Sequence, residues 1–105
     1  MMEDKRLRMD FYQKYELLEA LPGEGTRSFQ AKQINSGRAV TAHLLIGGRT
    51  PENEALLARI RVLPPASLAK VLEVGDNEGT PFVITEAPPY LHLSEWLAGH
   101  ERAAA

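Results

Sequence analysis

Two glycines stand close together in the stretch LPGEGTRSFQAKQ, at residues 21 to 33, between two segments that have the pattern of strands. A residue without a Cβ atom reaches backbone conformations and close approaches that other residues cannot reach. Gly23 and Gly25 could therefore bring backbone amides against an anion such as a phosphate. The same two residues are also typical of an ordinary turn between strands.

The other side chains with ligand or catalytic chemistry are scattered along the chain. His43 lies in an apolar segment, where a histidine is typical of a core position with hydrogen-bonded ring nitrogens. His92 and His100 follow far along the chain without the spacing of a metal site, and there is no cysteine. No Gly-x-Ser-x-Gly motif or comparable pairing of nucleophile and base is present. We therefore expect neither a metal site nor a hydrolase.

The composition indicates one globular domain. Of the 105 residues, 44% are hydrophobic and 25% are charged, close to the averages of globular proteins. With 12 basic and 14 acidic side chains, the chain lacks the clustered basic excess that nucleic-acid binding needs. No apolar run approaches the roughly 20 residues that span a bilayer, and no signal peptide begins the sequence. We expect neither a nucleic acid nor a membrane as partner, and the absence of cysteine suits the cytoplasm.

Hydrophobic periodicity and turn residues predict an α+β domain. Its five-stranded antiparallel sheet has one helix between the third and fourth strands and a short C-terminal helix. The expected strands cover residues 15–21, 28–33, 38–45, 68–74 and 80–85. Residues 75–79 are expected to form the hairpin loop between the last two strands. Thr50 as N-cap and Pro51 at the first position predict the start of the longer helix, and Pro64-Pro65 ends it. Ser94 is expected to cap the short helix over 93–97.

In order and spacing, these segments resemble the small N-terminal lobe of the protein kinase family. YELLEALPGEG is similar to the family's first strand and glycine-rich loop, and RSFQAKQINSGRAVTAHLL is similar to its second and third strands. NEALLARI resembles the helix that follows, and LAKVLEVGDNEGTPFVITEAPPYLHLSEWL resembles the last two strands, the hinge and the next helix. The resemblance divides the chain into an N-terminal extension (1–14), a kinase small-lobe-like domain (15–97) and a C-terminal tail or cloning remnant (98–105).

The resemblance implies a nucleotide cleft whose matching positions are Gly23, Gly25, His43 and Glu54. Kinases cover the ATP phosphates with a G-x-G-x-x-G loop, and here the loop is about two residues short and lacks the third glycine. His43 stands where an active kinase carries the V-A-I-K lysine that pairs with the phosphates and with a helix glutamate. An imidazole is shorter and mostly uncharged at neutral pH. Glu54 matches the helix glutamate, and Glu52 is the alternative match. Without the lysine, that glutamate has no partner for the ion pair.

The hinge of the resemblance also loses a donor for adenine. If Thr85 is the gatekeeper and Glu86 opens the hinge, adenine would bond the backbone N–H of Pro88, and proline has none. A shift of one residue moves the position to Ala87 or Pro89. The catalytic loop and metal motif of a kinase belong to a C-terminal lobe that this sequence does not contain. We therefore expect no catalysis by this chain, no cofactor and no binding of ATP.

These features favour a non-catalytic interaction or regulatory module, part of a longer bacterial-type protein, that binds a protein partner or self-associates. The underside of a kinase small lobe is apolar, and large apolar patches are seldom left in water. Either this face is repolarised here or another chain covers it. Tyr90, Leu93 and Trp96 lie in that region, where packing of the last helix would also explain them.

Two alternatives stay open. The chain could be the truncated ATP-binding lobe of a divergent serine/threonine protein kinase-like enzyme, in which the four cleft positions still line a nucleotide site. It could also be an unrelated α+β binding domain with the same order of strands.

Overall fold

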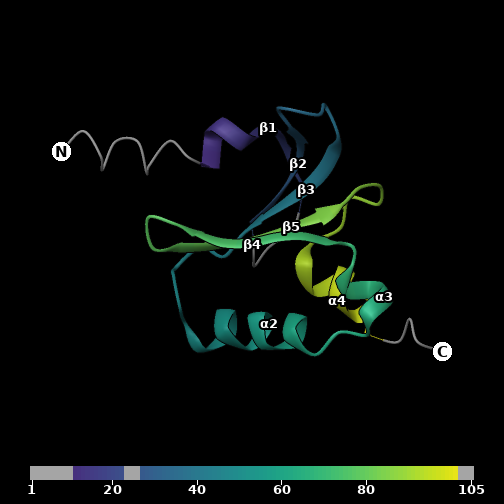
Figure 1. Cartoon of the computed structure of the whole chain (residues 1–105). Helices are drawn as coiled ribbons and strands as arrows, with labels where there is room; N and C mark the ends of the chain where they lie inside the picture. The colour runs from purple at the N-terminus through teal and green to yellow at the C-terminus, as the bar shows by residue number, and fades with distance from the viewer. Residues whose placement is uncertain (1–10, 23–26, 102–105) are drawn as a thin grey trace.

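The computed structural model describes residues 11–22 and 27–101 and places their strands in a five-stranded antiparallel sheet of order β1-β2-β3-β5-β4 (Figure 1). This arrangement confirms the predicted α+β class. The strands are β1 (Tyr15–Ala20), β2 (Arg27–Gln33), β3 (Ala39–Leu44), β4 (Val71–Asn77) and β5 (Thr80–Glu86). The helices after β3 are α2 (Pro51–Arg61), α3 (Pro65–Leu68) and α4 (Leu93–His100). A helical turn over residues 11–14 precedes β1.

The predicted strands match the observed ones to within a few residues except at β4. The prediction of a single helix between the third and fourth strands is wrong, because α2 ends at Arg61 and a second helix, α3, begins at Pro65 with Pro64 as its N-cap. Proline suits a first helical position, since its φ is preset and its missing N–H is not needed there. The predicted loop over 75–79 shrinks to Glu78-Gly79, whose φ values of 57° and 84° fit a two-residue hairpin turn.

Helix α2 begins as the sequence predicts. Thr50 is the N-cap, and its hydroxyl accepts the Asn53 N–H at 3.1 Å, which satisfies one of the unpaired amides of the first turn. Pro51 occupies the first helical position. The predicted Ser94 cap of the last helix is wrong, because α4 starts after His92 and Ser94 lies within its first turn.

One face of the sheet packs against α2 and α4, which lie below it in Figure 1. Val83 of β5 belongs to the same buried cluster as three α4 side chains, Leu93, Trp96 and Leu97. The two helices are also joined at their C-terminal ends, where Arg59 donates to both carboxylate oxygens of Glu101 at 2.6 and 2.9 Å. This face of the sheet is therefore covered by the chain's own helices.

The opposite face packs around aromatic rings. Phe11 is buried, and its ring centroid lies 4.9 Å from that of Phe82 and 5.4 Å from that of Tyr15. The Tyr15 hydroxyl donates to Glu73 at 2.5 Å and Lys14 donates to the same carboxylate at 2.7 Å, so β1 is tied to β4. Phe11, which the resemblance assigned to an N-terminal extension, is thus part of the core.

Replacing Gly75 and Gly99 by alanine should change the stability of the protein in opposite directions. A Cβ atom at Gly75 in β4 would lie 2.6 Å from the Phe82 ring, whereas one at Gly99 in α4 would meet nothing within 4 Å. We expect Gly75→Ala to destabilise the protein by about 1–3 kcal/mol through overpacking. Gly99→Ala should stabilise it by about 0.5–1 kcal/mol, since alanine loses less backbone entropy in a helix. Urea unfolding of both variants measures this, and a Gly75→Ala protein as stable as wild type would contradict the packing.

Candidate functional site

His43 is fully buried and both of its ring nitrogens are hydrogen bonded. Nδ1 lies 2.7 Å from the Ser28 hydroxyl on β2, and Nε2 lies 2.9 Å from the Thr85 hydroxyl on β5. A neutral imidazole has one donor and one acceptor nitrogen, and a hydroxyl can serve as either, so both tautomers of the ring are satisfied. The cross-strand partner of His43 is Val83, which places His43 on the face covered by α2 and α4.

This environment keeps the His43 imidazole uncharged. Burial, and to a smaller extent the nearby His92 at the start of α4, lower the pKa of His43 to about 3. The Ser28–His43 hydrogen bond has the composition of a nucleophile and its base, but the two residues are only 1% and 0% exposed. His43 is therefore a satisfied core histidine, as its apolar surroundings in the sequence indicate.

Of the other positions of the predicted cleft, only Glu54 belongs to the described residues, and it does not pair with His43. Gly23 and Gly25 lie outside the described residues. Glu54 lies in the first turn of α2, where it pairs with Arg49 at 3.3 Å, so its partner is not His43. The hydroxyl of Thr85, the predicted gatekeeper, is hydrogen bonded to His43.

Two of the apolar residues expected in the underside region, Leu93 and Trp96, belong to α4, which packs against α2 and β5. Leu93 and Trp96 are 0% and 1% exposed, which confirms the simpler interpretation of these two residues as helix packing. Tyr90 lies in the segment before α4 and is partly buried.

A groove that no sequence motif indicates lies between α2, α3 and β4 and encloses about 420 Å³. Leu57 and Ile60 of α2 are buried at its floor, and Leu68 of α3 and Val74 of β4 are 42% and 50% exposed at its rim. Half-exposed apolar side chains around a cavity are typical of a surface that binds another molecule. The exposure of Leu68 follows from the unpredicted helix α3.

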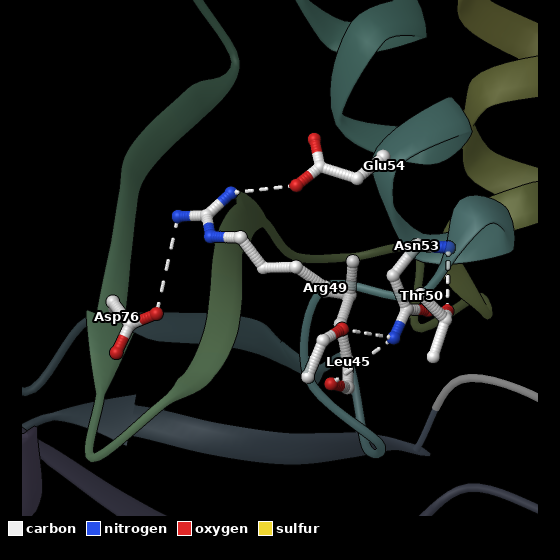
Figure 2. Close-up of polar contacts among 7 residues, drawn as sticks. Leu45, Arg49, Thr50, Asn53, Glu54 and Asp76 are labelled. Atoms are coloured by element: carbon white, nitrogen blue, oxygen red, sulfur yellow. Dashed lines mark hydrogen bonds and ion pairs between the residues drawn. The ribbon is translucent and has the colours of Figure 1, made fainter.

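Arg49 closes one end of this groove, and Figure 2 shows how it is held. Its guanidinium reaches Glu54 on α2 at 3.3 Å and Asp76 on β4 at 3.9 Å, so the side chain bridges the helix and the strand. Arg61, the last residue of α2, also lines the groove. Because Arg49 is 53% exposed, its ion pairs orient the side chain more than they stabilise the fold.

Asn53 fixes the start of α2 beside the groove. It is buried, and its side-chain amide donates to the carbonyls of Leu45, Ile46 and Gly48 in the β3–α2 loop. Figure 2 shows the amide beside Leu45. These hydrogen bonds tie the loop to the first turn of α2. Sequence reasoning missed this residue, although an asparagine three positions after an N-cap is a weak signal of such a role.

Comparison with known proteins adds no relative. No model of a protein family matches this chain, and a search of curated proteins finds no similar sequence. Within residues 11–22 and 27–101, no three acidic or histidine side chains are close enough to share a metal ion. None of the helices in those ranges combines the length and hydrophobicity of a bilayer-spanning segment.

The burial of His43 predicts how stability depends on pH. The folded-state pKa of about 3 lies below the ordinary value of 6.5, so protons bind preferentially to the unfolded chain. This group's contribution is fully present above about pH 6.5 and is lost as the pH falls toward 3, by about 1.4 kcal/mol per pH unit. The pH dependence of unfolding in urea should therefore be shallower in His43→Asn than in wild type. In NMR spectra the His43 ring should not titrate between about pH 7 and 5, and a midpoint near the ordinary value would contradict its burial.

Proposed function

We propose that this chain is a non-catalytic, kinase small-lobe-like domain that acts as a protein interaction or regulatory module in the cytoplasm. The observation that carries the proposal is the burial of His43 under the helices that cover its face of the sheet. This position would have to meet the phosphates of a nucleotide if the chain were an ATP-binding lobe. Here it has neither a permanent charge nor access to solvent.

The cost of opening this face argues against nucleotide binding. A ligand that reached His43 would displace α4, whose Leu93, Trp96 and Leu97 are buried. Each such side chain contributes about 1.5–3 kcal/mol through burial, so exposing the three costs about 5–9 kcal/mol. A ligand with a micromolar Kd supplies only about 8 kcal/mol in total. The free energy needed to displace the helix would therefore offset most or all of the binding free energy.

The groove beside α2 supports the second half of the proposal. It is open to solvent, its floor is apolar, and it is lined by residues that the core does not fully use. An accessible apolar groove next to a sealed ligand position favours binding of another polypeptide over chemistry on a small molecule.

Thermal unfolding with and without nucleotide tests this proposal. We expect the Tm of the chain to stay unchanged as Mg-ATP is raised to millimolar concentration, because a ligand that does not bind the folded state cannot stabilise it. Magnesium tripolyphosphate is the matched control for effects of charge alone. A saturable rise in Tm at sub-millimolar Mg-ATP, absent with tripolyphosphate, would contradict the proposal and favour a truncated ATP-binding lobe.

A further inference from the structure

The groove borders an open edge of the sheet. Among the strands of residues 11–22 and 27–101, in the order β1-β2-β3-β5-β4, β4 pairs with β5 alone, so its other side is an edge of this sheet. Backbone N–H and C=O groups on such an edge can pair with a further strand. Val74 is opposite Val83 in the register, so its side chain points to the helix-covered face and into the groove. The edge and the groove therefore form one continuous surface.

The dimensions of this surface suit an extended peptide. Arg49 and Arg61 mark its two ends, and α2 runs between them alongside β4 (Figure 1). The 11 residues of α2 span about 16 Å. An extended strand covers the same length with about five residues. Every second side chain of such a strand would point toward Leu57 and Ile60, and the cavity of about 420 Å³ has room for large apolar side chains.

The two arginines that line the groove, Arg49 and Arg61, favour peptides with acidic residues. Arg49 shares its guanidinium with two carboxylates at long distances, 3.3 and 3.9 Å, and is half exposed. Arg61 is exposed and makes no ion pair or side-chain hydrogen bond within the described residues. A carboxylate on the incoming segment would meet Arg61 at the end of the groove where α2 finishes. Acidic residues flanking an apolar centre are therefore favoured over basic ones.

We infer that this surface binds an extended, acidic and apolar segment of a partner protein, which adds as a strand to the free edge of β4. Its alternate apolar side chains enter the groove and its flanking carboxylate pairs with Arg61. A second copy pairing through β4 would not fill the groove, because its Val71 and Val74 point to its own helices. The inference rests on the proposed function and specifies the kind of partner.

Synthetic peptides test the inference directly. The probe is a labelled, capped octapeptide with phenylalanine and valine alternating in its centre and aspartate at both ends; the control peptide carries lysine at both ends. Fluorescence anisotropy with the full chain should give saturable binding of the acidic peptide, and affinity should be at least about tenfold weaker for the basic one. Amide shifts in NMR should fall on β4 and α2. Absence of saturable binding, or shifts confined to β1, would overturn the inference.

Matched variants separate the groove from the rest of the surface. Val74→Glu places a charge at the rim and should weaken binding about tenfold or more, whereas Arg61→Glu should weaken it several-fold in a salt-dependent way. Val62→Glu is the control, because Val62 is 78% exposed, has the same chemistry and does not line the groove. Its affinity should stay within about twofold of wild type. Equal losses in Val62→Glu and Val74→Glu would overturn the assignment.

N-methylated peptides test the strand geometry itself. In an added strand, alternate amides bond to β4 and the others face away. Methylation of one alternate set should therefore abolish binding, and methylation of the other should not. Equal tolerance of both sets would rule out strand addition, and dimerisation of the chain through β4 with no peptide binding would assign the surface to a second copy. Either result would leave the nucleotide experiment, and hence the proposed function, unaffected.

Discussion

The rest of this structure depends on the packing of α4 against α2 and against the face of the sheet that carries Val83 and His43. Leu93, Trp96 and Leu97 place three large apolar side chains against α2 and β5. They convert the underside of the sheet from an accessible surface into a core. With that face closed, the imidazole of His43 loses contact with water and stays neutral, and its hydrogen bonds to Ser28 and Thr85 become internal to the fold.

The same packing leaves the groove on the other side of α2. The helix is anchored at its start by the Thr50 cap and by the Asn53 amide, and at its end by Arg59 and Glu101. These contacts fix the position of α2 in the structure, and Val74 of β4 stays 50% exposed. The groove lies between them, and Arg49 bridges it at one end. A groove that is already formed reduces the ordering cost of binding an extended chain.

The fold was predictable because each element carries a local signal. Thr50-Pro51 marks a helix start, Pro64-Pro65 marks its end, and alternating apolar residues mark the strands. Helix α3 was not predicted, because a segment of four residues is too short to show a helical periodicity. Ser94 is not the cap because α4 already begins at Leu93, with His92 as its N-cap and no side-chain capping hydrogen bond.

The site was harder to predict than the fold. His43 could be assigned to the core from its apolar neighbours alone, but its partners lie 15 and 42 positions away in the sequence. The groove joins Arg49, Leu57, Leu68 and Val74 from four separate segments, none of which has a motif. Such a surface exists only after the register of β4 and the position of α2 are set. The relationship to the protein kinase family stays a prediction.

Quenching of tryptophan fluorescence tests the packing of α4 most directly, because the chain contains a single tryptophan, Trp96. At neutral pH the emission should be blue-shifted relative to the chain unfolded in guanidinium, and acrylamide should quench it far less efficiently, since Trp96 is 1% exposed. Addition of Mg-ATP should change neither property. Emission and quenching equal to those of the unfolded chain would mean that α4 does not cover the sheet, and the account of the sealed face would be wrong.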